Sequence, residues 1–261
     1  MAEEPVESLS FKLSKGEKIY FASDFHLGTP DRKSSLEREL KIVRWLTEIS
    51  GDAKAIFLVG DLFDFWFEYK HTIPKGFIRF LGKLAELRDR NIPIFFFTGN
   101  HDLWMFDYFP SELGIPVYSR PVSFQVNDKN IYVGHGDGLG PGDSFYKFLK
   151  GVFSNKLSQW LFHRIHPNTG VGIAKYWSKR SRISSEDQED QFLGDKEVLL
   201  QYCRSVEINN HHDYYIFGHR HLPLETEVTK NSKYFNLGEW VNHFTYLELD
   251  ENEASLKSFD T

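Results

Sequence analysis

The sequence predicts one α/β domain that contains a mixed sheet and a helical insertion. Strand-length apolar runs alternate with amphipathic stretches of helical spacing over the first hundred residues. A turn-rich tetrad, Asn127–Asn130, separates two short apolar runs and predicts a β-hairpin. From about 141 to 191 no β-run occurs and helical stripes recur. A chain of 261 residues suits one large core, so we expect a single domain over 1–261 with an insertion at about 141–191.

The first half of the chain predicts a layered α/β arrangement. Residues 1–16 are polar and acidic, so we expect a frayed start or an edge element there. Apolar runs predict three buried strands, and helical spacing predicts two helices between them. The strands are Lys18–Ser23, Ala55–Val59 and Pro93–Phe97, and the helices are Ser35–Ser50 and Phe77–Leu87. Ser34 and Glu37 have the spacing of a capping box, which we expect to start the first helix.

The second half predicts a mixed sheet. The hairpin over Val122–Val133 requires antiparallel pairing, whereas the earlier strands are joined by crossover helices. After the helical insertion, we expect a helix around Asp195–Val206 and a strand at Asp213–Phe217. A last antiparallel pair is predicted within Phe235–Leu249.

Composition excludes several classes of protein. The net charge of −6 and pI near 6.0 argue against a general nucleic-acid binder, which needs a basic face. Cys203 is the single cysteine and cannot form an intramolecular disulfide, so a reducing cytosol is expected. The N-terminus has no signal-peptide pattern, and no apolar run approaches the roughly 20 residues of a membrane span, so we expect neither export nor insertion. Aromatic residues reach 16%, and we expect some to face an apolar ligand.

Five short polar clusters at the ends of apolar segments indicate a site for two metal ions. They are Asp24-Phe25-His26, Gly60-Asp61-Leu62-Phe63-Asp64, Gly99-Asn100-His101-Asp102, Gly134-His135-Gly136-Asp137 and Gly218-His219-Arg220-His221. Hydrolytic divalent metals take oxygen and imidazole ligands, and a pair about 3.5 to 4 Å apart needs a bridging carboxylate. Asp61 is the natural bridge. Asp24 and His26 can converge only if the chain bends at Phe25.

Each cluster alone has a plain structural alternative. An isolated Asp-x-His or His-x-His is more often a satisfied polar loop than a ligand pair, and Gly with Asn at a strand end also makes an ordinary turn. Together, the five supply two shells rich in oxygen and imidazole, and three of them follow a clear apolar strand. His219 and His221 can then serve one ion each, with Arg220 pointing away between them. The combination therefore favours a metal site over five unrelated loops.

The motif series resembles that of the calcineurin-like metallophosphoesterases, which runs DxH, GDxxD, GNH(D/E), GHxD and GHxH. The resemblance implies a four-layer α/β/β/α sandwich of two mixed sheets, with two divalent cations, Mn²⁺ or similar, across the strand ends. It assigns His101 as an acid or charge stabiliser beside the metals, oriented by Asp102. It assigns Asp24, His26, Asp61 and His221 to one metal, and Asp61, Asn100, His135 and His219 to the other.

Three further segments, residues 23–28, 135–146 and 173–182, are similar to a lipid A-pathway branch of this family, and this similarity extends from about 20 to 240. It implies a UDP-sugar carrying two acyl chains as substrate, cleaved at the uridine-side phosphorus to release UMP, with the insertion holding the acyl chains. The implied position is cytoplasmic and peripheral on the anionic inner membrane. The best-known members of that branch carry Arg where this chain has His101. The implied substrate contacts are Asp143, Tyr146, Lys175, Arg180 and Arg182.

Alternatives stay open for these contacts and for the activity. Asp143 and Tyr146 equally suit capping and packing of the first insertion helix, and the basic residues equally suit a solvated face. A phosphodiesterase or phosphatase acting on nucleotides or phosphoproteins would keep the metals without the lipid. Aromatic packing inside the insertion with no groove would favour that activity. A non-catalytic scaffold is the third possibility, although no metal ligand of the family pattern is missing.

Overall fold

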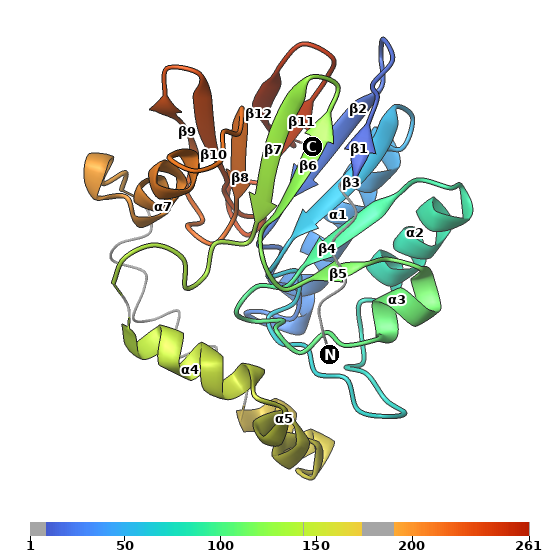
Figure 1. Ribbon diagram of the computed structural model, residues 1–261. Helices are drawn as coiled ribbons and strands as arrows, with labels where there is room; N and C mark the ends of the chain where they lie inside the picture. The colour runs from blue at the N-terminus through green and yellow to red at the C-terminus, as the bar shows by residue number, and fades with distance from the viewer. Residues whose placement is uncertain (1–8, 143, 174–190, 261) are drawn as a thin grey trace.

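Two six-stranded β-sheets pack face to face in the computed structural model, which describes residues 9–142, 144–173 and 191–260 (Figure 1). One sheet has the strand order β12-β11-β2-β3-β4-β5 and the other β1-β6-β7-β8-β10-β9. Both contain parallel and antiparallel pairs, so both are mixed as expected. The first sheet consists of β2 (Lys18–Ala22), β3 (Ala53–Val59), β4 (Ile94–Phe97), β5 (Val117–Tyr118), β11 (Thr245–Leu249) and β12 (Ala254–Ser258).

The second sheet is built mainly from the other half of the chain. Its strands are β1 (Ser10–Phe11), β6 (Val122–Val126), β7 (Lys129–Gly134), β8 (Tyr214–Phe217), β9 (Pro223–Thr229) and β10 (Ser232–Leu237). The predicted hairpin is confirmed, because β6 and β7 pair antiparallel around the turn at Asn127. The expected edge element is also confirmed, because β1 pairs with β6 at the border of the sheet.

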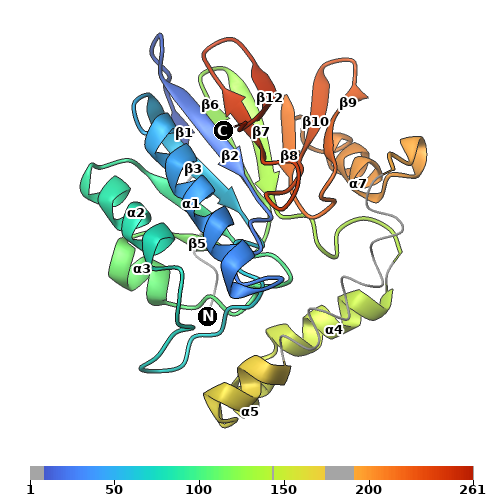
Figure 2. The same ribbon diagram turned by 180° about the vertical axis from the view of Figure 1, so that it is seen from behind.

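Helices cover the outer face of each sheet and complete four layers (Figure 2). Three helices pack on the first sheet and one on the second; they are α1 (Arg32–Ile49), α2 (Ile78–Asp89), α3 (Tyr108–Leu113) and α7 (Val198–Glu207). Successive strand residues alternate between layers, since Phe21 and Phe57 pack between the sheets while Tyr20 and Ile56 face the helices. The α/β/β/α architecture is therefore confirmed.

Helices of the insertion lie outside the sandwich. In both views α4 (Ser144–Ser154) and α5 (Lys156–His163) lie beyond the carboxyl ends of the central strands rather than against a sheet face. α5 contacts the sandwich through aromatic side chains, since the Phe162 ring lies 4.6 Å from the ring of Phe67 and 4.7 Å from that of Trp104. The Trp104 Nε1 also donates to the Phe153 carbonyl at 2.9 Å, which fastens the end of α4. The two helices thus cover the edge at which the strands end.

Two local predictions are wrong. Helix α1 begins three residues early because Asp31, and not the Ser34–Glu37 box, accepts hydrogen bonds from the first backbone N–H groups. The final strands do not pair with each other, because β10 joins the second sheet and β11 pairs with β2 in the first. The sequence did not predict α3, β5, β9 or β12, which are short or only half-buried.

Candidate metal centre

Five loops bring the predicted polar clusters to one edge of the sandwich. Each cluster follows the carboxyl end of β2, β3, β4, β7 or β8. Because β2, β3 and β4 are parallel neighbours in one sheet, and β7 and β8 in the other, their loops open on the same side. Backbone hydrogen bonds join the loops in pairs: the Asp24 N–H donates to Gly60 and the Gly218 N–H to His135, both at 3.0 Å.

Most candidate ligands lie on strained backbone. Positive φ angles occur at Asp24 (56°), His26 (44°), Asp61 (52°), His219 (70°) and His221 (55°). Each left-handed residue other than glycine costs on the order of 1 kcal/mol, and such residues gather where geometry serves function. The bend predicted at Phe25 is confirmed, because Asp24 and His26 turn to one side while Phe25 is fully buried on the other.

Two motif glycines make room for candidate ligands. A Cβ at Gly60 would lie 2.5 Å from the His135 Nδ1, and a Cβ at Gly218 would lie 2.5 Å from the Asp24 Oδ2. Gly60 also has a φ of +84°, which other residues rarely adopt. These glycines therefore let loops from the two sheets approach closely enough to share a site.

Gly60→Ala is expected to lower metal affinity at least tenfold, because the added methyl group must displace the His135 ring. Metal content after dialysis against buffered metal measures the effect. Gly82→Ala is the matched control, since Gly82 lies in α2 with nothing within 4 Å of the added Cβ. The control should keep its metal and gain about 0.5–1 kcal/mol of stability. Equal metal retention by both variants would contradict the packing argument.

Three candidate ligands form the first group. The Asp24 Oδ1 lies 3.3 Å from the His221 Nε2 and 3.8 Å from the His26 Nε2, and the two imidazole nitrogens are 3.1 Å apart. These atoms all lie within 4.8 Å of one another, close enough to surround one cation. A second group is formed by Asp24, Asp61 and His135, in which the Asp61 Oδ2 lies 3.4 Å from the His135 Nε2. Asp24 belongs to both groups, and Asp61 lies in a third group with His26 and His101.

Orphaned buried atoms show that these residues fit a divalent cation. Within the described part of the chain, the Asp24 Oδ1, Asn100 Oδ1 and His135 Nε2 are buried without a hydrogen-bond partner. Buried polar atoms are almost always satisfied, so three orphans at one point indicate a missing partner. Carboxylate oxygen, amide oxygen and imidazole nitrogen are ligands suited to hydrolytic divalent metals. The residues therefore support binding of divalent metal ions.

The pKa values of two candidate histidine ligands reflect the groups that surround them. The His135 Nδ1 faces the Val59 carbonyl at 2.9 Å, so this nitrogen donates its proton and leaves Nε2 to face Asp61. Burial disfavours the imidazolium form, yet the carboxylates of Asp61 and Asp24 outweigh it and raise the pKa of His135 to about 10. The paired carboxylates thus attract positive charge. Burial and the nearby His135 lower the pKa of His219 to about 4, so its ring is neutral.

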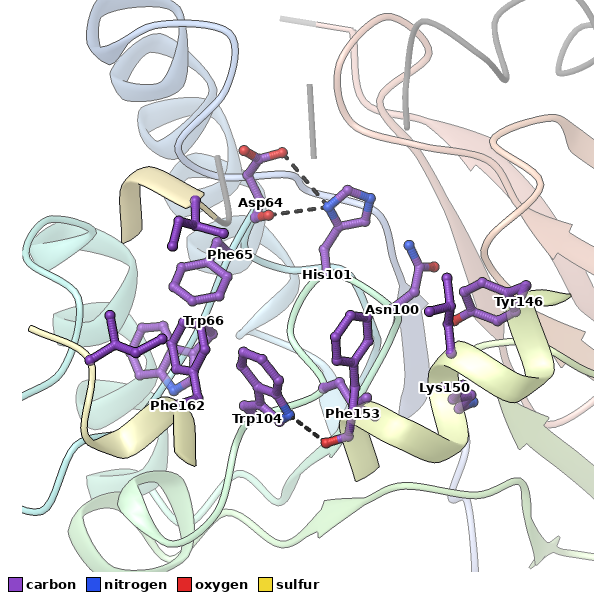
Figure 3. Close-up of a pocket in the computed structure, with 14 residues that line it drawn as sticks. Asp64, Phe65, Trp66, Asn100, His101, Trp104, Tyr146, Lys150, Phe153 and Phe162 are labelled. Carbon is purple, nitrogen blue, oxygen red and sulfur yellow. Dashed lines mark hydrogen bonds and ion pairs between the residues drawn. The ribbon is translucent and has the colours of Figure 1, made fainter. Parts of the chain in front are cut away.

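The expected orientation of His101 by Asp102 is wrong. Both oxygens of Asp102 accept backbone N–H groups, from Gly99 at 2.7 Å and Leu62 at 2.7 Å. Asp102 therefore fixes the geometry of two site loops. The His101 Nδ1 instead faces Asp64, 3.1 Å from its carbonyl and 3.8 Å from its carboxylate (Figure 3). Asp64 is the second Asp of the GDxxD motif, and this motif is the sequence signal from which its contact with His101 could have been predicted.

Asp137 is another carboxylate whose role was not predicted from the sequence. It holds α4 against the site. Its Oδ2 accepts from the Tyr146 hydroxyl at 2.6 Å and lies 2.7 Å from the Lys150 Nζ. Tyr146 is thus placed beside the metal loops.

The other four predicted substrate contacts, Asp143, Lys175, Arg180 and Arg182, lie outside the described residues. Arg220 points away from the candidate ligands and pairs with Glu197 at 2.7 Å, as a structural salt bridge.

An apolar pocket of about 380 Å³ opens beside Asn100 and His101. Its walls come from the site loops and from α4 and α5, as Figure 3 shows for Trp104, Phe153 and Phe162. The lining is mostly aromatic or aliphatic, and consists of Asp64, Phe65, Trp66, Asn100, His101, Leu103, Trp104, Tyr146, Leu149, Lys150, Phe153, Phe162, Ile165 and Ile173. This volume lies in the range of ligand-binding pockets. The expected face for an apolar ligand therefore exists next to the metal centre.

The fold and the metal centre define a phosphoesterase of the calcineurin-like class. A profile of the Metallophos family, described as calcineurin-like phosphoesterase, matches residues 17–223, so the chain belongs to this family. Among curated proteins, the UDP-2,3-diacylglucosamine hydrolase of Porphyromonas gingivalis is 35% identical over 93% of this chain and 98% of that protein. The UDP-2,3-diacylglucosamine hydrolase of Vibrio parahaemolyticus is 26% identical over 91% and 96%. The solved structure of Yfce, a phosphoesterase from E. coli, matches with a TM-score of 0.48 at 16% identity, covering 93% of each chain.

Proposed function

We propose that this protein hydrolyses the pyrophosphate of UDP-2,3-diacylglucosamine, releasing UMP and 2,3-diacylglucosamine 1-phosphate in lipid A biosynthesis. The observation that carries the proposal is the apolar pocket that opens onto Asn100 and His101 of the metal centre. A phosphate ester joined to acyl chains needs a polar reaction site directly beside an apolar cavity. The curated relatives that bear this enzyme's name support the assignment.

The metal centre is proposed to hold two divalent cations, most suitably Mn²⁺. Asp24, His26 and His221 would hold one, and Asn100, His135 and His219 the other, with Asp61 bridging them. When bound, such cations lower the pKa of coordinated water to about 7 and offset charge on phosphoryl oxygens. The orphaned atoms of Asp24, Asn100 and His135 support this ligand set.

The surrounding residues then orient and stabilise the substrate. We assign His101 to stabilise charge that develops on the phosphoryl group, because its ring lines the pocket mouth next to Asn100. Asp64 holds the Nδ1 side of that ring, so the Nε2 side is directed away from Asp64. Asp102 is a positioning residue, since it acts through the backbone of the loops that carry Asp61 and Asn100.

The pocket is proposed to hold acyl chains, and α4 and α5 to act as its lid. Each CH₂ group moved from water into such a pocket contributes about 0.8 kcal/mol, so six of them would contribute roughly 5 kcal/mol. The lid belongs to an insertion over about 141–191 in a single domain. Lys175, Arg180 and Arg182 keep their proposed role at the second phosphate or the glucosamine headgroup, and Asp143 and Tyr146 keep theirs as substrate contacts.

The alternative substrates are less well supported. A phosphodiesterase for nucleotides or phosphoproteins would be favoured by a closed aromatic insertion, but the described lid helices leave a pocket of about 380 Å³. A non-catalytic scaffold would need no ligand set, whereas Asp24, His26, Asp61, His135 and His221 of the proposed set fall in groups that could hold a metal ion. The metallophosphoesterase alternative is therefore kept as an outcome of the test below.

We also propose that the lid rests on an anionic membrane surface. Apolar side chains on the outer faces of α4 and α5 are exposed, among them Phe145 (72%), Phe148 (66%) and Trp160 (51%). The Arg164 guanidinium lies 4.8 Å over the Trp160 ring, a pairing suited to the interface between acyl chains and headgroups. None of the helices within the described ranges is long and apolar enough to span a bilayer.

Replacing both Phe145 and Phe148 with Ser is expected to weaken binding to anionic liposomes at least tenfold, because two exposed rings lose their contact with lipid. Co-sedimentation with phosphatidylglycerol vesicles measures this partition. Ile78→Ser is the control, because Ile78 is 76% exposed but lies on α2. Undiminished vesicle binding by the double variant would contradict the membrane position.

The assay for the proposed function compares hydrolysis of three substrates by purified protein with Mn²⁺, followed as UMP release from two UDP-sugars and as phenol release from an aryl phosphodiester. UDP-2,3-diacylglucosamine should exceed UDP-N-acetylglucosamine by at least 10³-fold in kcat/KM, in line with the roughly 5 kcal/mol of acyl burial. An aryl phosphodiester reports the metal centre alone. Turnover of only the aryl ester would remove the lipid assignment and leave a metallophosphoesterase of other specificity.

A further inference from the structure

Glu68 is a buried carboxylate behind the wall of the apolar pocket. Its side chain is only 4% exposed, and it closely follows Asp64–Trp66, a stretch whose residues line the pocket. A charged group that is withdrawn from water is unfavourable unless polar groups of the protein replace its hydration. The hydrogen-bond partners of this carboxylate therefore show what it holds in place.

Four N–H groups donate to the Glu68 carboxylate. The Trp66 indole donates to its Oε1 at 3.0 Å. The backbone N–H groups of Phe106, Asp107 and Tyr108 donate to its Oε2 at 2.9, 2.8 and 3.1 Å. Hydrogen bonds to a charged group are shorter and stronger than those between neutral groups. Glu68 thus joins two segments that lie far apart in the sequence.

The second of these segments is the start of α3, which has no cap of its own. Asp107 occupies the N-cap position without a side-chain hydrogen bond. Glu68 takes that role from a distant segment, since the N–H groups at the start of a helix favour an anion. A side chain at the N-cap itself would stabilise the helix without burying a charge. The use of a distant buried carboxylate therefore indicates a role beyond the stability of α3.

Both segments held by Glu68 carry tryptophans that line the apolar pocket. Trp66 stands two residues before Glu68, and Trp104 stands two residues before Phe106. The segments run side by side, because Phe67 and Trp104 form a parallel β-bridge. Figure 3 shows both tryptophan side chains among those that line the pocket. The carboxylate therefore fixes the two indole-bearing segments relative to each other.

Trp104 is also a point at which the lid helices contact the sandwich. Its Nε1 donates to the Phe153 carbonyl of α4 at 2.9 Å, and its ring lies 4.7 Å from the Phe162 ring of α5. A shift of the turn that Glu68 holds would move Trp104 and, with it, this contact. Because α4 and α5 also line the pocket, Glu68 affects both the sandwich side and the lid side of the pocket.

We propose that Glu68 is a positioning residue for acyl-chain recognition, which fixes the Trp66 indole and the turn after Trp104 so that the pocket keeps its shape. The assignment rests on the proposed function and adds a residue outside the pocket that sets the preference for acylated substrate. Both carboxylate oxygens accept N–H groups, so in Glu68→Gln the amide NH₂ opposes a donor whichever way it turns. The substitution keeps the size of the side chain and releases one of the two segments.

The test measures kcat/KM for UDP-2,3-diacylglucosamine and for an aryl phosphodiester with Mn²⁺. Glu68→Gln is expected to lower the lipid value by about tenfold or more, mainly through KM, because a buried N–H group loses its acceptor. The aryl value should change less than twofold, since the metal centre is left intact. Glu68→Asp keeps the charge but is too short to contact both sets of donors, and should lower the lipid value in the same direction.

Glu39→Ala is the matched control for loss of stability. Glu39 is also 4% exposed, and its Oε1 accepts the backbone N–H groups of Arg79 and Phe80 at the start of α2. It therefore caps a helix from a distance, as Glu68 does, but away from the apolar pocket. This variant should unfold at a lower temperature than the unaltered protein and keep the ratio of the lipid value to the aryl value.

Binding of dansyl-undecanoic acid to the Mn²⁺-loaded protein gives a readout that does not depend on turnover. Its dissociation constant should rise by about tenfold in Glu68→Gln and stay within twofold in Glu39→Ala. Trp66→Phe removes the indole N–H that opposes the new amide. The double variant Trp66→Phe/Glu68→Gln should therefore lose less affinity than the product of the two single losses.

A lipid-to-aryl ratio that stays unchanged in Glu68→Gln and Glu68→Asp would overturn the positioning role. Equal losses for both substrates would also overturn it, because they would show general support of the fold, and so would independent losses in the double variant. If Glu68→Gln weakens binding of the fatty acid while the unaltered protein fails to cleave UDP-2,3-diacylglucosamine, the positioning role stands and the lipid substrate falls. Failure of the two proposals is therefore distinguishable.

Discussion

Asp61→Asn is expected to lower turnover of any phosphoester substrate by on the order of 10³-fold or more. Asp61 is the carboxylate that faces both candidate ligand groups, since its Oδ2 lies 3.4 Å from the His135 Nε2 and it also joins a group with His26. An amide has nearly the same shape but no charge, so it cannot bridge two cations equally well. The substitution therefore removes charge with little change in packing.

Metal content and turnover should fall together in this variant. Elemental analysis after gel filtration is expected to give two equivalents of Mn²⁺ in the unaltered protein and fewer in Asp61→Asn. Asp89→Asn removes the same charge from an exposed position at the end of α2 and should leave both quantities unchanged. Full metal content with full turnover in Asp61→Asn would contradict the bridging role.

Leu149→Glu is expected to reduce kcat/KM for UDP-2,3-diacylglucosamine at least 30-fold. Leu149 lies on α4 and lines the apolar pocket, so a carboxylate there must be desolvated when an acyl chain enters. The thirtyfold change corresponds to about 2 kcal/mol, which is less than three buried CH₂ groups contribute. The effect should appear mainly in KM, because the substitution lies away from the reacting phosphorus.

The ratio of kcat/KM between diacylated and non-acylated UDP-sugar measures this effect most cleanly. In Leu149→Glu the ratio should fall by the same factor as kcat/KM for the lipid. Leu40→Glu places the same charge on an exposed position of α1, where Leu40 is 38% exposed, and should keep the ratio. An unchanged ratio in Leu149→Glu would show that acyl chains bind elsewhere.

The metal centre was predictable from sequence because its signals are local. Each cluster stands directly after an apolar run, and parallel strands carry such ends to one edge without further information. The bend at Phe25 followed from geometry alone, since Asp24 and His26 would otherwise point the same way along a strand without converging. Local patterning therefore located the candidate ligands before any packing was known.

Features that depend on distant partners were not predictable in the same way. The role of Asp102 was wrong because its hydrogen-bond partners, such as the Leu62 N–H, lie some 40 residues away. The sheet that each of the last strands joins is likewise set by distant partners. β10 pairs with β8 and β9 in one sheet, and β11 pairs with β2 in the other. The apolar pattern of a strand does not specify which sheet it joins. The apolar pocket exists only once α4 is docked through Asp137 and Trp104.

Hydrolysis of UDP-2,3-diacylglucosamine in H₂¹⁸O, with Mn²⁺ and mass analysis of both products, tests the central claim most directly. The proposed reaction delivers water to the uridine-side phosphorus at a metal centre beside the acyl pocket. The expected result is one ¹⁸O atom in UMP, none in 2,3-diacylglucosamine 1-phosphate, and no product after chelation of the metal. Label found only in the sugar phosphate, or UMP release that persists without metal, would contradict the account.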